Sequence, residues 1–220
     1  MVRRFEERYR SATALEAAFL ERYTENGHLT RAEAGIAYFH RPGRMRWEYE
    51  SPEKNLFLVD SRWAWFYVPA DHTVTRVPAK RSSDWRTPIV LLADNPKLSK
   101  VCSQIAPSVT VSPDVAGDTV LFCFMRGSKP AGGASDNQIG SSSQAVESRA
   151  IAQGDAIFLE LEPQTGVLTR VLVTQPGGIS IEFRFSNWQF DPILPDSLFR
   201  FEPPAGVAIV DGELPAEGRR

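Results

Sequence analysis

The sequence has no long hydrophobic run and no excess of charge of one sign. Its apolar runs all fall short of the roughly 18 residues that a membrane-spanning helix needs. Lys and Arg number 25 and Asp and Glu 27, and the cations are scattered rather than clustered. Nucleic-acid binders concentrate basic residues on one face. The sequence therefore predicts neither a spanning helix nor a nucleic-acid interface.

The common catalytic motifs are also missing. The chain contains no G-x-S-x-G nucleophile turn, no phosphate loop and no H-E-x-x-H metal pair. Asp71 and His72 could form a triad with Ser82 or Ser83, but Asp71-His72 falls in a predicted hairpin turn. The prediction is a protein that is not an enzyme, with a site at His72 as the alternative.

Cysteine and histidine are scarce. Cys102 and Cys123 are too few for a disulfide framework, so they form either one bridge in an exported protein or two buried thiols. His28, His40 and His72 have no ligand spacing with either cysteine. We expect no metal site and no cofactor.

The N-terminal residues, MVRRFEERYR, show no apolar core of a secretory signal. The following apolar residues recur at steps of three and four, which predicts an amphipathic helix over 3–23 that ends at Asn26-Gly27. These apolar positions are Phe5, Tyr9, Ala12, Leu15, Phe19 and Tyr23.

Strand-like segments separated by turn residues fill most of the remaining chain. They are predicted at 34–40, 44–50, 55–60, 63–68, 72–78, 108–112, 118–125, 156–162, 166–174 and 179–187. A short helix is expected after Thr87-Pro88. Short turns imply antiparallel pairing, so the fold class is α+β, a strongly curved sheet or unclosed barrel with helices against one face.

Residues 126–154 interrupt this pattern because they are rich in Gly and Ser and poor in large apolar side chains. They are predicted to form a flexible insertion between two strands, with an interdomain linker as the alternative. Each half has few strands, so a single domain over 1–220 is preferred.

The central strands carry an unusual number of aromatic residues. Met45, Trp47 and Tyr49 alternate with charged residues, which predicts one buried face. The segments NLFLVD and RWAWFYV are apolar on both faces. Either the protein covers both sides of these strands, or one side lines a lipid-sized cavity.

Several segments resemble the bacterial outer-membrane lipoprotein carrier family (LolA). The similar segments are GIAYFHRPGRMRWEYESPEKNLFLVD, WFYVPADHTVTR, TPIVLLAD and LFRFEPPAGVAIVD. The resemblance covers roughly residues 5–95 and 155–211, and the R-P-G-R-x-R-W-x-Y cluster is its most specific part. It implies an unclosed β-barrel with a lid of short helices over a hydrophobic cavity.

The resemblance also implies a function. Family members are periplasmic and shield lipoprotein acyl chains between an inner-membrane ABC transporter and an outer-membrane acceptor, without a cofactor, and we expect a monomer. The alternative is a lipid-sensing or regulatory module on the same fold. By position, Arg41 would latch the lid. The residues that would line the cavity or lid are Met45, Trp47, Tyr49, Phe57, Trp65, Tyr67, Ile89, Leu91 and Leu92.

Overall fold

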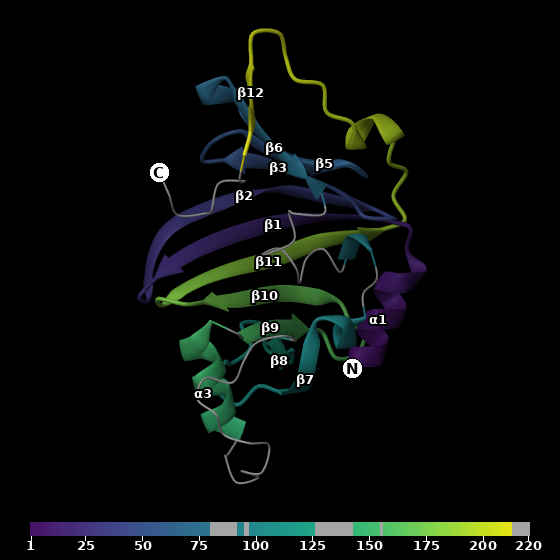
Figure 1. The fold of residues 1–220 in the computed structure, drawn as a ribbon. Coiled ribbons are helices and arrows are strands. Elements are labelled where there is room, and N and C mark those ends of the chain that lie inside the picture. The colour runs from purple at the N-terminus through teal and green to yellow at the C-terminus, as the bar shows by residue number, and fades with distance from the viewer. Residues whose placement is uncertain (80–91, 95–96, 126–142, 155, 213–220) are drawn as a thin grey trace. The chain divides into compact units, whose positions relative to one another are not determined.

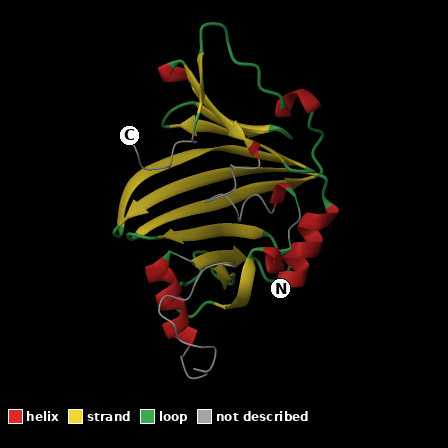
Figure 2. Cartoon of the chain, in the orientation of Figure 1, coloured by secondary structure: helices red, strands yellow, loops and turns green. Residues whose placement is uncertain are grey.

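The computed structural model describes residues 1–79, 92–94, 97–125, 143–154 and 156–212. The described chain is mostly strand, with a few short helices (Figures 1 and 2). In chain order its helices and strands are α1 (Val2–Ser11), β1 (Ala14–Glu25), β2 (His28–His40), β3 (Arg44–Ser51), β4 (Asn55–Val59), β5 (Trp63–Val68), η1 (Pro69–Asp71), β6 (Thr73–Pro78), η3 (Leu98–Lys100), β7 (Cys102–Pro107), β8 (Thr119–Met125), α3 (Ser143–Gln153), β9 (Ala156–Leu161), β10 (Leu168–Gln175), β11 (Ile179–Phe190), η4 (Asp196–Phe199) and β12 (Ala208–Asp211).

The described strands form one twelve-stranded sheet in the order β12-β6-β5-β4-β3-β2-β1-β11-β10-β9-β8-β7. Pairing is antiparallel from β2 to β6 and from β7 to β11, whereas β12 pairs parallel with β6. The two edge strands stand at opposite ends of this order, so the sheet is not closed. The predicted α+β class with an unclosed antiparallel sheet is confirmed.

The start of the chain differs from its prediction. A helix over 3–23 is wrong beyond Ser11, because β1 begins at Ala14. A step of four residues keeps side chains on one face of a helix and also on one face of a strand, so Leu15, Phe19 and Tyr23 fit both. Asn26-Gly27 has positive φ at both residues (48° and 81°) and makes the hairpin turn into β2 rather than a helix end.

Most of the later strand predictions are confirmed, with two corrections. The predicted strand at 108–112 is wrong, because β7 ends at Pro107 and the next residues form a turn. Residues 143–153 are the helix α3 and not a flexible loop, while the rest of the Gly/Ser-rich insertion, 126–142, lies outside the described residues. Of the helix expected after Thr87-Pro88, only Leu92 and Ala93 are described, and both are helical. The single domain over 1–220 stays a prediction.

The described chain divides into two compact units. The first unit comprises Met1–Arg8, Arg22–Arg31 and Lys97–Arg184. Within it, α3 packs on one face of β8, β9 and β10 through an apolar cluster whose buried members are Val120, Phe122, Ala150, Ala156 and Phe158. The Cys102–Cys123 disulfide joins the edge strand β7 to β8, so the open question about these cysteines is answered by a bridge.

The second unit comprises Tyr9–Glu21, Ala32–Pro96 and Phe185–Arg220. It contains the antiparallel run from β2 to β6 and the C-terminal segment. Gly35, in the segment that resembles the LolA family, lies opposite Tyr49 at a register shift of the β2–β3 pair. A Cβ atom there would lie 1.8 Å from the Glu48 carbonyl oxygen. Only glycine allows this close approach.

Candidate functional site

One face of the sheet in the second unit is built from large apolar side chains. Trp47 and Phe57 lie directly opposite each other on β3 and β4, so their side chains share a face. The Phe19 ring of β1 lies 4.7 Å from the Trp47 ring and 5.1 Å from the Tyr49 ring, centroid to centroid. We call this set the aromatic face; its members are Phe19, Phe39, Met45, Trp47, Tyr49, Phe57, Phe185 and Trp188.

The alternation of β3 produces this face. Met45, Trp47 and Tyr49 are each at most 4% exposed. The intervening side chains turn to the other side, where Arg46 pairs with Glu48 at 2.6 Å. The prediction that the three apolar residues share one buried face is confirmed, and their role as a cavity wall stays a prediction.

A buried polar pair adjoins the aromatic rings. The Tyr49 hydroxyl donates a hydrogen bond of 2.9 Å to Oε2 of Glu21, and both residues are buried. Glu21 lies two residues after Phe19 on β1, so the two side chains share a face. The hydrogen bond offsets part of the cost of burying a carboxylate among apolar groups.

Trp65 and Tyr67 are not on this face, which corrects their grouping with Phe57. Trp65 pairs with Leu58 and Tyr67 with Leu56, whereas Phe57 pairs with Phe66. Trp65 and Tyr67 therefore point to the opposite face.

The C-terminal segment covers that opposite face. Phe201 lies 5.5 Å from the Trp65 ring and 5.6 Å from the Tyr67 ring, and Val207 packs on the same cluster. The double-sided apolar character of β4 and β5 thus has a structural explanation, with the aromatic face on one side and the C-terminal segment on the other.

Sequence reasoning missed four members of the aromatic face. The pattern at the start of the chain places Phe19 in a helix, and Phe39 stands in a predicted strand without a distinguishing signal. Phe185 and Trp188 lie near the end of β11, where Phe183 and Phe185 alternate with charged or polar residues. That alternation was the available signal for Phe185.

Arg41 lies in the turn between β2 and β3 and contacts three backbone carbonyls. Its guanidinium donates to the carbonyl oxygens of Arg10 (3.0 Å), Ala12 and Leu92 (3.2 Å). Arg10 belongs to the last turn of α1, where the carbonyls are exposed and favour a cation. Arg41 therefore ties the end of α1 to the helical residues at 92–93.

Backbone bonds reinforce this junction. The Arg41 amide donates to the Thr13 carbonyl at 2.9 Å, and the Gly43 amide donates to the Ala93 carbonyl at 2.8 Å. Burial lowers the pKa of the Arg41 guanidinium, and the nearby Asp94 and Asp191 carboxylates act in the opposite direction. An arginine nevertheless stays charged at neutral pH, so the junction keeps its cation.

The remaining predicted site residues are placed as follows. Leu92 is 1% exposed, whereas Ile89 and Leu91 lie outside the described residues. Asp71 closes the short helix η1 and His72 follows it, both exposed, while Ser82 and Ser83 also lie outside the described part. Within the part of the chain that the structure describes, no cluster of His, Cys, Asp or Glu could hold a metal ion, and no helix is long and apolar enough to cross a membrane.

Comparison with known proteins agrees with the resemblance in the sequence. Residues 10–113 match the family model described as outer membrane lipoprotein carrier protein LolA, and residues 165–211 match a family described as predicted periplasmic protein (DUF2092). The outer-membrane lipoprotein carrier protein of Nitrosospira multiformis is 26% identical over 185 residues, which are 83% of this chain and 74% of that protein. The carrier protein of the same description from Xanthomonas axonopodis pv. citri is 27% identical over 210 residues, 91% of this chain and 83% of that protein.

A solved structure supports the fold. An uncharacterized conserved protein from Thermus thermophilus superimposes with a TM-score of 0.55 at 12% identity, over 96% of this chain and 97% of that one. The curated relatives are named as carriers and not as enzymes, in agreement with the expected absence of catalysis. One matched family is described as periplasmic, in agreement with the expected location. The chain is therefore similar to the LolA family over residues 10–113 and to the outer-membrane lipoprotein carrier proteins over most of its length.

Proposed function

We propose that the protein is a periplasmic carrier that shields the acyl chains of lipoproteins and moves them from an inner-membrane ABC transporter to an outer-membrane acceptor. The aromatic face carries this proposal, because it gathers large apolar side chains that are buried in this form and that a hydrocarbon chain can pack on once they are uncovered. The names of the curated relatives support the class of cargo. The disulfide suits an oxidising compartment such as the periplasm.

The energetics suit a carrier. Burying an acyl chain is worth about 0.8 kcal/mol per CH₂, so a long chain exposed to water costs on the order of 10 kcal/mol. A carrier must offset this cost and still release its cargo. Arg41 supplies a means of control, because its three carbonyl contacts hold the end of α1 and residues 92–93 together. In our proposal this is the closed, cargo-free form.

Binding of a fluorescent fatty-acid analogue to delipidated protein tests the proposal. The wild type should bind it, and Trp47→Ala should weaken binding at least about tenfold, because the central ring of the aromatic face is removed. Circular dichroism checks that the variant is folded. Wild-type protein that is folded but does not bind the analogue overturns the proposal.

Arg41→Leu tests the latch. Without its carbonyl contacts the closed form loses stability, so the open form is more populated and the analogue should bind about tenfold more tightly and leave more slowly. Arg44→Leu is the matched control, since Arg44 belongs to the same hairpin but pairs with Asp196 on the covered side. If Arg41→Leu and Arg44→Leu release the analogue at the same rate, Arg41 is not a latch.

Release of a lipoprotein from inner-membrane vesicles separates transport from sensing. A carrier releases the lipoprotein into solution and then delivers it to outer-membrane vesicles. A lipid-sensing module binds the fatty-acid analogue but releases nothing, and that result replaces the carrier with the alternative function.

A further inference from the structure

Ile193 is fully exposed to solvent, at 100% of its reference area. The other exposed large apolar residues in the described part of the chain lie between 37% and 57%. Ile193 belongs to the segment 191–196, which connects β11 to η4 and reads Asp-Pro-Ile-Leu-Pro-Asp. An isoleucine that is exposed to this extent contributes nothing to the core of the protein.

The segment 191–196 is fixed at both ends. At its start, the Asp191 amide donates to the Ala14 carbonyl at 2.9 Å, and the Asp191 carboxylate accepts from the Thr13 amide at 2.6 Å. At its end, Asp196 accepts from the Arg44 guanidinium at 2.9 Å. Pro192 and Pro195 restrict φ between these anchors. Ile193 is therefore held out on a rigid loop, so a partner that buries it loses little conformational entropy.

This loop lies at the same end of the sheet as Arg41. β11 ends there, β1 begins there, and the turn between β2 and β3 carries Arg41, whose amide donates to Thr13. Thr13 is the residue that also binds Asp191. Ile193 and the proposed latch thus share one end of the second unit.

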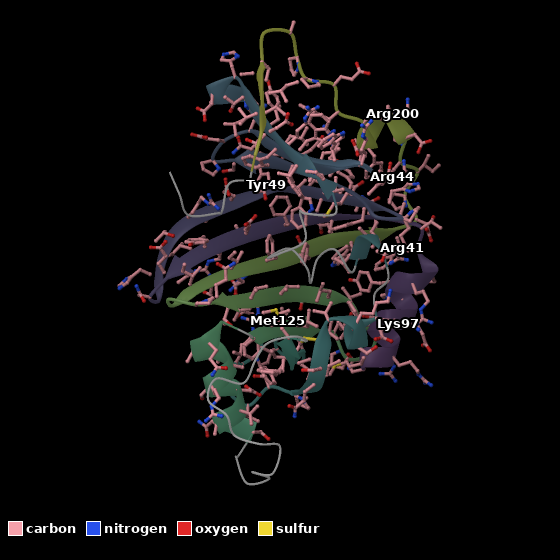
Figure 3. All side chains as sticks on the ribbon, in the orientation of Figure 1. Arg41, Arg44, Tyr49, Lys97, Met125 and Arg200 are labelled. Carbon is pink, nitrogen blue, oxygen red and sulfur yellow. A yellow bond between two sulfur atoms is a disulfide. The ribbon has the colours of Figure 1, made fainter. Side chains whose placement is uncertain are left out.

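Cationic side chains lie near both ends of the loop, Arg41 at Asp191 and Arg44 and Arg200 at Asp196. Arg10 and Arg200 are exposed, and the charge of Arg200 acts on the Asp196 carboxylate. Figure 3 shows Arg41, Arg44 and Arg200 following one another along the edge where the chain leaves β11 and enters η4. The Asp191 and Asp196 carboxylates balance part of this charge: Asp191 accepts from Thr13 and faces Arg41, and Asp196 accepts from Arg44. Asp94 also acts on Arg41.

We propose that this end of the second unit docks on an anionic phospholipid bilayer, with Ile193 inserted at the boundary of headgroups and acyl chains. An exposed apolar side chain among cations is the combination that binds such surfaces, since hydrocarbon burial and attraction to anionic headgroups act together. One isoleucine gives about a tenfold gain in affinity, and each arginine near the surface about fivefold. The contact is weak and reversible, and it brings the Arg41 junction to the membrane surface.

Co-flotation with vesicles tests the proposal. Wild-type protein should float with vesicles of equimolar phosphatidylcholine and phosphatidylglycerol, and much less with phosphatidylcholine alone. Ile193→Asp should reduce the bound fraction about tenfold or more, and Arg200→Gln about fivefold. Leu29→Asp is the matched control, because Leu29 is 52% exposed and lies at the end of β2 remote from Arg41. This variant should bind the vesicles as the wild type does. Absence of flotation, or equal flotation of wild type and Ile193→Asp, overturns the proposal.

Insertion has its own readout. The two native cysteines form a disulfide, so Ile193→Cys offers a single thiol for a solvatochromic dye. The emission should shift to the blue with anionic vesicles, and no shift while the protein is bound overturns insertion. Binding of the soluble fatty-acid analogue by Ile193→Asp should equal that of the wild type, so failure of the docking surface and failure of the carrier function give different results.

Discussion

Asp191 links the loop of Ile193 to the start of β1 from an exposed position. The Thr13 amide and hydroxyl and the Ala14 amide donate to its carboxylate and lower its pKa, with Arg41 adding to the effect. A lowered pKa in the folded state means that the carboxylate stabilises the fold above its ordinary pKa of 3.8. This contribution is lost as the pH falls through the folded-state pKa.

Asp191→Asn should therefore lower the melting temperature at neutral pH by about 1–2 °C, a small change because solvent screens the charge of an exposed carboxylate. The difference between wild type and variant should stay constant from about pH 7 to 5 and shrink below about pH 4. Thermal unfolding across this range measures it. A difference that persists unchanged at about pH 3 contradicts the role of the charge.

At the residue scale, alternation in the sequence predicted which side chains of β3 are buried, and the structure agrees. It did not predict that Trp65 and Phe57 point to opposite faces, because that depends on the register between β4 and β5. A register is set by pairing between strands and by the turn, and neither strand encodes it alone. The contacts of Arg41 with backbone carbonyls distant in sequence could be predicted only from the family resemblance.

At the scale of elements, the first strand shows where periodicity fails. Phe5 and Tyr9 belong to α1, whereas Leu15, Phe19 and Tyr23 belong to β1. Ala12 between them lets one pattern of three- and four-residue steps run through both elements. Ala17, which is fully buried between Leu15 and Phe19, carries the missing signal of a two-residue period. Its small side chain gives little contrast in hydrophobicity, so the helical pattern prevailed.

The helix α3 was not predicted, because its segment has low hydrophobicity. A buried carboxylate of this helix bonds it to the turn that follows β7. Glu147 is 1% exposed and accepts hydrogen bonds from the Val109 amide at 2.9 Å, the Thr110 amide at 3.1 Å and the Ser108 hydroxyl at 3.0 Å. One acidic side chain thus accepts several of the hydrogen bonds donated by the turn that follows β7. No pattern within α3 alone shows this, because the donors lie in another segment.

Glu147→Ala should destabilise the protein by about 2–3 kcal/mol, since it removes a buried charged acceptor on which several hydrogen bonds of this turn converge. Arg149→Ala, on the exposed side of the same helix, is the matched control and should change stability by less than about 0.5 kcal/mol. Urea unfolding measures both, and hydrogen exchange should show faster exchange at Val109 and Thr110 in the first variant only. Similar stability of the two variants contradicts the anchoring role.

At the scale of the whole molecule, the two units divide the features between them. The aromatic face, Arg41 and Ile193 belong to the second unit, whereas α3, the Glu147 turn and the disulfide belong to the first. The chain order does not separate them, because β1, β2 and β11 each contribute to both units. The alternating segments and the turns between them predicted the sheet but not this division, which arises from contacts between segments distant in sequence.

Reduction of the disulfide tests this division. Cys102 and Cys123 are separated by 21 residues, and closing a loop of this length is worth about 3 kcal/mol in the chain-entropy model. Reduced and alkylated protein should therefore unfold at a lower temperature. Its affinity for the fatty-acid analogue at room temperature should equal that of the oxidised protein, because the proposed binding wall lies in the other unit. Cys102→Ala/Cys123→Ala, which removes the bridge without alkylation, controls for the bulk of the modifying group. If either reduced form keeps its circular dichroism spectrum but loses the analogue, the binding wall depends on the first unit, and the cargo site extends beyond the aromatic face.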